Sequence, residues 1–127
     1  MPDIKFLDSA FSTRFCKAAD YPEIVTSVIR EMQRQVGDLS INTEGIATRG
    51  LLIRHLVMPS CGEDTKRILR FIQEEISQDA FVNIMAQYYP CNKAEYYPEI
   101  ARRVSDREVI EALDFAHELG LTRATNH

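Results

Sequence analysis

Gly-Leu-Leu-Ile-Arg-His-Leu-Val-Met-Pro, residues 50–59, is a segment dominated by apolar side chains. This pattern predicts a parallel strand that is buried on both faces, and Pro59 ends the strand because proline cannot donate to the ladder. The exceptions are Arg54 and His55. An arginine in such a strand is costly unless it meets an anion. Ligands in parallel α/β proteins sit near the carboxyl ends of the strands, so we expect a functional site here.

Outward from this strand, helical and strand patterns alternate along the chain. Alternating or apolar runs predict two further strands, and apolar spacings of three and four predict the helices. The predicted strands are residues 2–7, 50–59 and 80–86, the predicted helices are residues 9–19, 20–36, 63–77 and 105–119, and a turn at residues 42–45 predicts a β-hairpin.

The order of these elements predicts an α/β fold of three βα units with parallel strands and right-handed crossovers, plus the small hairpin excursion. Three strands are too few to close a barrel, and both edges of the sheet would be unpaired. We therefore expect one domain, residues 1–127, built as half of a TIM-like barrel. The final residues, 121–127, are expected to fray.

The helix from residue 20 carries the strongest local signals. Asp20 is placed to cap it, Pro22 suits its first turn, and Glu23 completes a capping-box pattern. Its apolar stripe is predicted to face the core rather than a binding surface. The residues of that stripe are Ile24, Val25, Val28, Ile29, Met32 and Val36.

Composition excludes several classes of protein. The chain has 127 residues, a net charge of −4 and no run of lysines or arginines, so the electrostatic footprint of a nucleic-acid-binding protein is missing. No apolar run has transmembrane length and nothing resembles a signal peptide, which favours a cytoplasmic protein without a membrane partner. The three cysteines are odd in number and widely separated, which argues against a disulfide framework.

Residues 50–59, the acidic helix after them and Phe-Val-Asn-Ile-Met-Ala-Gln-Tyr-Tyr-Pro at residues 81–90 together resemble the C-terminal half of radical S-adenosylmethionine proteins. The group with the greatest resemblance comprises pyruvate formate-lyase-activating enzyme and its uncharacterised iron-sulfur relatives. The opening Pro-Asp-Ile-Lys-Phe and the closing Tyr-Pro-Glu-Ile-Ala-Arg-Arg fit the same pattern. The resemblance implies a partial barrel of six βα units, of which this chain supplies the last three.

The same resemblance implies an oxidoreductase chemistry and a set of site residues. In the family, a 4Fe-4S cluster cleaves S-adenosylmethionine to a radical that often acts on a glycyl-radical enzyme. By match, Asp3 and Lys5 are expected beside cofactor and substrate, and Arg54 at the methionyl part of S-adenosylmethionine. Leu56 falls at a backbone contact to the adenosine, His55 lies next to it in the cofactor-binding set, and Gln87 lies near a polar contact of the last strand.

The chain departs from the family in one decisive respect. A cluster needs three thiolates at C-x-x-x-C-x-x-C spacing, and no two cysteines here share a loop. We therefore expect no cluster in this chain and no radical chemistry from it alone. One interpretation is a truncated or split half that needs its missing N-terminal half or a second chain. The other is a free-standing, non-enzymatic module that binds a small ligand or a protein. Either would self-associate through open sheet edges.

A metal site is a separate alternative from the residues alone. His55, Cys61 and Cys91 fall at or just beyond the ends of neighbouring predicted strands, where they can converge on zinc or iron. Against this, structural zinc sites usually show paired ligands at short spacing, and the same residues also suit free loop thiols and a hydrogen-bonded strand histidine. A Cys-His nucleophile pair lacks an evident orienting partner.

Overall fold

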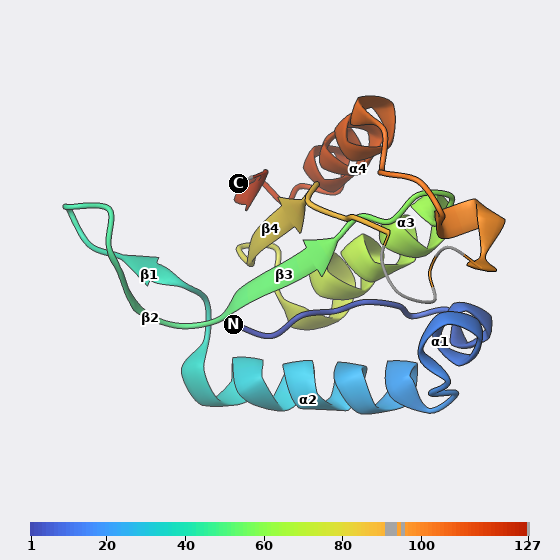
Figure 1. Cartoon of the computed structure of the whole chain (residues 1–127). Helices are drawn as coiled ribbons and strands as arrows, with labels where there is room; N and C mark the ends of the chain where they lie inside the picture. Colours follow the sequence, from blue (N-terminus) through green and yellow to red (C-terminus); the bar gives the residue numbers. More distant parts are fainter. Residues whose placement is uncertain (91–93, 95, 127) are drawn as a thin grey trace.

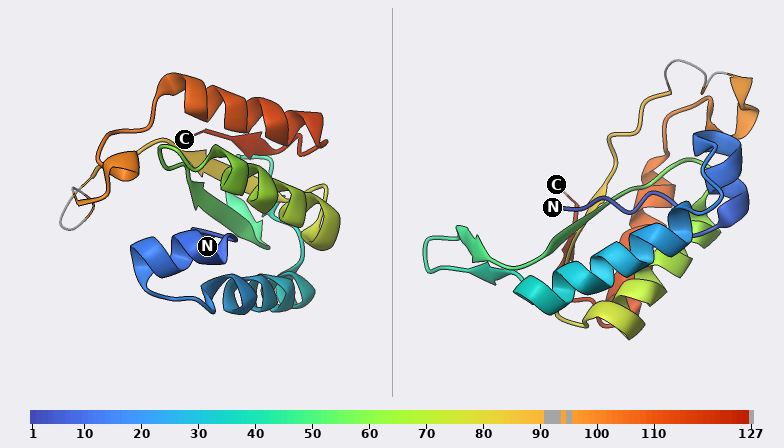
Figure 2. Two further views of the ribbon diagram at one scale, coloured as in Figure 1. Left: turned by 90° about the vertical axis from the view of Figure 1, so that its right-hand side faces the viewer. Right: turned by 90° about the horizontal axis from the view of Figure 1, so that it is seen from below.

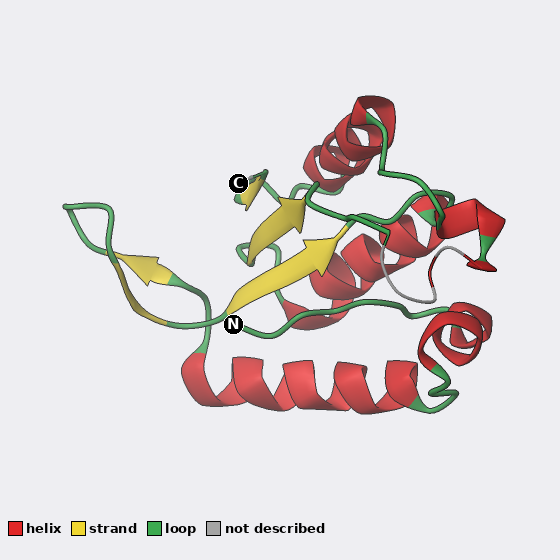
Figure 3. Ribbon diagram, viewed as in Figure 1, coloured by secondary structure: helices red, strands yellow, loops and turns green. Residues whose placement is uncertain are grey.

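The structure is a computed structural model that describes residues 1–90, 94 and 96–126. Figure 1 shows the elements and Figure 3 their types. They are α1 (Ser9–Cys16), α2 (Tyr21–Val36), β1 (Ser40–Ile41), β2 (Ala47–Arg49), β3 (Leu52–Leu56), α3 (Gly62–Phe71), the π-helical turn η1 (Ile72–Ile76), β4 (Phe81–Met85), the 3-10 turn η3 (Pro98–Ile100), α4 (Asp106–Glu118) and β5 (Ala124–Thr125).

The central sheet is parallel, with the order β3-β4-β5. The predicted mixed α/β class with parallel strands is therefore confirmed. The predicted first strand, residues 2–7, is shorter than expected: it pairs with β3 through a single parallel bridge between Asp3 and Arg54. The Ile4 amide donates to the Arg54 carbonyl at 2.9 Å, and the Arg54 amide donates to the Pro2 carbonyl at 2.9 Å.

The C-terminal tail is ordered over most of its length, which corrects the expectation of fraying. Ala124 and Thr125 pair in parallel with Val82 and Asn83 of β4. The physical reason is burial, because Ala124 lies in the core. The Asn126 side-chain amide also donates to the Ile84 carbonyl at 2.9 Å, which fastens the chain beyond the strand.

Three helices, α2, α3 and α4, pack on one face of the sheet, and the left view of Figure 2 shows them in an arc beside the strands. Side chains alternate between the faces of a strand, so every second residue of β3 and β4 points into this helical layer. The core combines Ile53, Val57, Val82 and Ile84 from the strand segments with Val25, Ile29, Ile68, Leu69, Ala112 and Ala116 from the helices.

The opposite face of the sheet carries the other alternate residues. Leu52, Arg54 and Leu56 of β3 are half-buried, whereas Ile53 and His55 between them are buried. The same alternation holds in β4. Parallel sheets in soluble proteins are normally covered on both faces. In the described part of the chain no helix covers this second face, which is called the uncovered face below.

Helix α2 differs from its predicted packing. Only Val25 and Ile29 of the six apolar stripe residues are buried, and Ile24, Val28, Met32 and Val36 are exposed. The stripe is wider than the core that it meets, so one side of the helix packs against nothing among the residues that the structure describes. Asp20 precedes α2 but makes no side-chain cap hydrogen bond, so the predicted capping box is absent there.

Two other local predictions are confirmed. Ser105 and Glu108 form a reciprocal capping box at the start of α4. Strands β1 and β2 form the expected antiparallel hairpin around the turn at residues 42–45. The Asn42 side-chain oxygen accepts from the amides of Glu44 and Ile46, both at 2.9 Å, which closes the turn. The hairpin projects from the end of the molecule where β3 begins (Figure 1).

Among the residues that the structure describes, no helix combines the length and the apolarity that a membrane crossing needs.

Gly50 allows the hairpin to return closely to β3. Its φ is +102°, and a Cβ at this position would collide with the carbonyl group of Asp38. Gly50→Ala should therefore lower the free energy of unfolding by at least about 2 kcal/mol, measured by urea denaturation. Gly62→Ala is the matched control, because a Cβ at Gly62 meets no atom within 4 Å. Equal stability of the two variants would contradict the assigned close contact.

Candidate functional site

A row of polar side chains crosses the uncovered face from strand to strand. Its members lie at the same height along the strands, which is called a level here. Strand pairing places Asp3 beside Arg54, Arg54 beside Asn83, and Asn83 beside Thr125. Residues paired in register share a face, so four strand segments contribute one polar residue each. In barrels, inward-facing residues of successive strands stack in such layers. The next level is mostly apolar, with Leu56 paired to Met85.

The Arg54 guanidinium is held by Asp3 in a bidentate pair. Arg54 Nε donates to Asp3 Oδ1 at 2.6 Å, and Nη2 donates to Oδ2 at 3.1 Å. The two side chains are 36% and 41% exposed, so the pair faces solvent and contributes little stability by itself. A guanidinium has five N–H donors. The pair uses two of them, and the remaining donors can bind a second carboxylate.

A hollow of about 240 Å³ lies next to this pair on the uncovered face. Its lining residues are Asp3, Ile4, Lys5, Leu56, Met58 and Met85. Three of the predicted site residues, Asp3, Lys5 and Leu56, therefore meet at one place, with Arg54 bonded to Asp3. Complete ligand pockets usually measure 300–1,000 Å³. The hollow has the size of part of a site, with charged groups on one side and apolar groups on the other.

His55 lies on the other side of the sheet from the hollow. Its Nδ1 donates to the Ile4 carbonyl at 2.7 Å, and its Nε2 accepts from the Thr65 hydroxyl at 2.9 Å. Because the carbonyl can only accept, Nδ1 carries a proton, and in the neutral ring Nε2 is then the acceptor of the bond from Thr65. Burial lowers the pKa of His55. The ring therefore anchors the N-terminal segment and does not face a ligand on the uncovered face.

A second anchor comes from the start of α3. The buried Asp64 carboxylate accepts from the Leu7 amide at 3.0 Å. Burial raises the pKa of Asp64, while the backbone amides of Leu7 and Asp8 act in the opposite direction. His55 and Asp64 together hold residues 4–7 against the helical layer, which presents Asp3 and Lys5 to the uncovered face.

The described residues do not support the alternative metal site. They include no group of three or more histidine, cysteine, aspartate or glutamate side chains arranged to hold a metal ion. Both ring nitrogens of His55 are engaged in hydrogen bonds. Cys61 is buried, and burial together with nearby carboxylates, Asp64 first, raises the pKa of its thiol to about 12, which disfavours the thiolate that binds metals. Cys91 lies outside the described residues.

Two members of the polar row, Asn83 and Thr125, were not predicted from the sequence. The alternation of Phe81, Asn83 and Met85 along one strand was a usable signal for Asn83. Thr125 had no such signal because its strand has two residues. Its buried Oγ1 has no hydrogen-bond partner among the described residues. Gln87, which was predicted, is exposed beyond the end of β4 and does not line the hollow.

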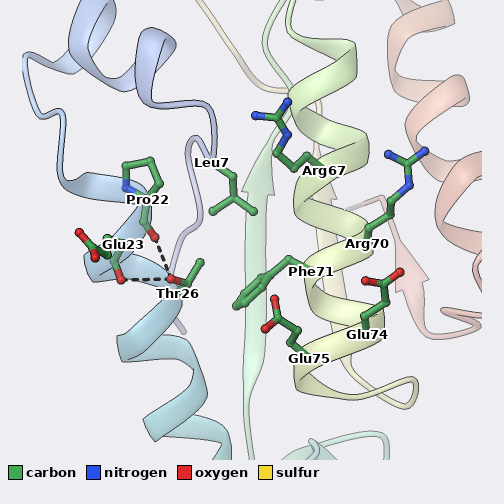
Figure 4. A pocket seen from close by; sticks show the side chains of 9 residues that line it. All are labelled: Leu7, Pro22, Glu23, Thr26, Arg67, Arg70, Phe71, Glu74 and Glu75. Atoms are coloured by element: carbon green, nitrogen blue, oxygen red, sulfur yellow. Dashed lines mark hydrogen bonds between the residues drawn. The ribbon is translucent and has the colours of Figure 1, made fainter.

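A larger hollow of about 500 Å³ lies elsewhere, between α2 and α3 (Figure 4). Phe71 points from α3 toward α2, and the Thr26 hydroxyl donates to the Pro22 carbonyl at 2.9 Å. The charged lining is mixed: Glu23 lies on α2, and Arg67, Arg70, Glu74 and Glu75 lie across from it on α3 and η1. This hollow belongs to the helical layer and contains none of the predicted site residues.

The neutral His55 predicts a pH dependence of stability. In the folded chain the pKa of His55 lies below its unfolded value of about 6.5. The unfolded chain therefore binds more protons, and the free energy of unfolding falls as the pH drops below about 6.5. The slope from this group is at most about 1.4 kcal/mol per pH unit. Urea unfolding between pH 5 and 7 should show this slope in the native chain. The His55→Gln variant should lose it, and a slope that persists would assign the titration to another group.

The chain is similar to an uncharacterised protein of Methanocaldococcus jannaschii, with 33% identity over 125 residues. The alignment covers 95% of this chain but 32% of that protein, so the chain spans about a third of the length of the curated relative it matches. No protein-family model matches the chain, and no solved structure matches it.

Proposed function

We propose that this chain is the cofactor- and substrate-facing C-terminal part of a radical S-adenosylmethionine protein, resembling pyruvate formate-lyase-activating enzyme, and that it is inactive alone. The observation that carries the proposal is the uncovered face. It brings Asp3, Lys5 and Leu56 to one hollow and bonds Arg54 to Asp3. These are residues that the family resemblance assigns to S-adenosylmethionine and substrate.

The arrangement of the layers supports the proposal of half a (β/α)6 barrel. Parallel strands are followed by helices on one side, and the other side carries alternating levels of polar and apolar residues. In a partial barrel that second face becomes the interior. The hollow is smaller than a usual ligand pocket, as expected if the other half of the barrel supplies the remaining walls of the site. The relative, about three times as long, has room for such a half.

The donor set fits S-adenosylmethionine. The Arg54 guanidinium has N–H donors beyond its pair with Asp3 for the methionyl carboxylate. Leu56, Met58 and Met85 offer apolar contact for the adenosine. When bound, the cofactor supplies the radical chemistry of the family, and the residues of this chain bind and orient it. The donor set does not fit an iron-sulfur cluster, because the sequence lacks three cysteines at the required spacing. The missing half would provide the cluster.

A free-standing binding module is the second candidate, and one observation favours it. The edge of the sheet at the N-terminal segment is covered by the Tyr21 hydroxyl, which bonds to the Lys5 amide and the Asp3 carbonyl. Proteins with open sheets protect their edges in comparable ways. In this case the hollow would bind a small ligand or protein segment without radical chemistry.

The four methionines allow a direct test of ligand binding. With methyl-labelled methionine, S-adenosylmethionine should shift the NMR signals of Met58 and Met85, which line the hollow, and leave that of Met32 on α2 unchanged. The affinity of an incomplete site should be weak. Arg54→Ala should reduce the affinity for S-adenosylmethionine about tenfold or more, because the methionyl carboxylate of the cofactor loses its charged partner.

The control variant is Arg107→Ala, which removes an arginine paired to Glu111 on the exposed surface of α4. It should bind like the native chain. Binding that Arg54→Ala leaves unchanged would contradict the proposed role of Arg54. An iron-sulfur absorption that appears in this chain after anaerobic reconstitution would contradict the assignment of the cluster to a missing half.

A further inference from the structure

The Tyr21 hydroxyl makes two hydrogen bonds to the outer edge of the N-terminal segment. It accepts from the Lys5 amide at 2.9 Å and donates to the Asp3 carbonyl at 3.3 Å. The inner edge of the same segment bonds to β3 through the Ile4 amide and the Pro2 carbonyl. Tyr21 therefore satisfies the two backbone groups that flank Ile4 on the side facing away from the sheet.

These two groups form the pattern that a parallel strand recognises. In a parallel ladder, each bonded residue faces one residue of the opposite strand. Its amide donates to the carbonyl of the residue that precedes the facing one, and its carbonyl accepts from the amide of the residue that follows the facing one. For a partner opposite Ile4, those groups are the Asp3 carbonyl and the Lys5 amide. A single tyrosine hydroxyl can replace both, because it is a donor and an acceptor. The Tyr21 hydroxyl thus makes the two hydrogen bonds that one residue of a parallel strand would make at this edge.

The exposed side of α2 continues from this edge. Tyr21, Ile24, Val28 and Met32 recur at spacings of three and four, so they lie along one side of the helix. Pro22 and Thr26 lie on the opposite side and line the hollow toward α3 (Figure 4). Ile24 is 54% exposed and Val28 is 43% exposed. Sheet edge and helix side therefore present one continuous surface, which we call the docking edge: Asp3, Lys5, Tyr21, Ile24, Val28 and Met32.

We propose that the docking edge receives a preceding βα unit of a longer polypeptide, and that the Tyr21 hydroxyl is displaced when the strand of that unit pairs with Asp3 and Lys5. The helix of the unit then packs on Ile24, Val28 and Met32. The arrangement of helices and strands identifies the occupant. Helices α2, α3 and α4 lie on the same side of the parallel strands, so a βα unit that continues this arrangement before the N-terminal segment would lie at the docking edge. The M. jannaschii relative has about two thirds of its length outside the match.

This inference rests on the part of the proposed function that places the chain in a larger barrel, but it does not depend on S-adenosylmethionine. The same labelled methionines separate the two. Met32 lies in the docking edge, and Met58 and Met85 lie at the hollow. Docking of a partner shifts Met32. Binding of S-adenosylmethionine to the chain shifts Met58 and Met85, so either response can be observed without the other.

The hydroxyl cap is tested first in the chain alone. Tyr21→Phe removes the hydroxyl and keeps the ring, which packs against the core. Amide hydrogen exchange of Lys5 should accelerate in this variant by about tenfold, since its acceptor is lost, while that of Ile4, bonded to β3, should change little. Equal exchange of Lys5 in both proteins would overturn the assignment of Tyr21 as the edge cap.

Docking is tested with the part of the M. jannaschii relative outside the match, produced as a separate chain. The matched segment of that relative, mixed with its own remainder, is the positive control. We expect this chain to bind the remainder in isothermal titration calorimetry with a shift of the Met32 signal. Ile24→Glu should weaken binding at least tenfold. Ile110→Glu is the matched control, because Ile110 on α4 is equally exposed, at 55%, and lies outside the docking edge. It should bind normally.

Tyr21→Phe should bind the remainder up to about tenfold more tightly, because no hydroxyl competes with the incoming strand. Binding that Ile24→Glu and Ile110→Glu weaken equally would overturn the location of the docking edge. No binding by this chain, when the positive control associates, would overturn the proposed occupant. A dimer of this chain that Ile24→Glu dissociates would also overturn it, since the occupant would then be a second copy.

Discussion

The attachment of the N-terminal segment to Arg54 is the interaction on which the rest of the structure depends. Arg54 holds the segment twice, with its backbone between Pro2 and Ile4 and with its side chain on Asp3. An arginine in an apolar strand needs an anion, and Asp3 supplies it at the surface of the sheet. The same contact aligns Asp3 and Lys5 with the hollow. The segment therefore joins the core through Ile4 and forms the candidate site through its alternate residues.

Much of the fold followed from periodicity. The apolar run of β3, the alternation of β4 and the stripes of α3 and α4 each predicted the observed element, because these segments meet the same core. Helix α2 shows the limit of that reasoning. Its stripe is as regular as theirs, but regular spacing does not reveal how many neighbours a helix has, and Ile24 and Val28 face none among the described residues. The pairing of Thr125 was not predictable either, because two residues carry no period.

The residues of the candidate site could be found in part from the sequence, by two different routes. Resemblance to a family pointed to Asp3, Lys5, Arg54 and Leu56, and the structure gathers them on one face. Strand alternation would have improved that prediction. His55 is adjacent to Arg54, so the two side chains must point to opposite faces of the sheet, and one of them had to be structural. The same rule selects Asn83. The partner of each residue depends on strand register, which the sequence alone did not fix.

The hairpin of β1 and β2 has a consequence for how this chain can vary in length. Its residues are exposed, and its turn is closed by the side chain of Asn42, which belongs to the turn itself. Its base is tied to the remainder by the bridge between Asp38 and Leu51. The two strands and their turn, residues 40–49, are exposed, so this part can be lengthened, shortened or exchanged without opening a void in the core. Insertions and deletions among homologous chains should therefore concentrate at this projection, where an added recognition element costs the fold nothing.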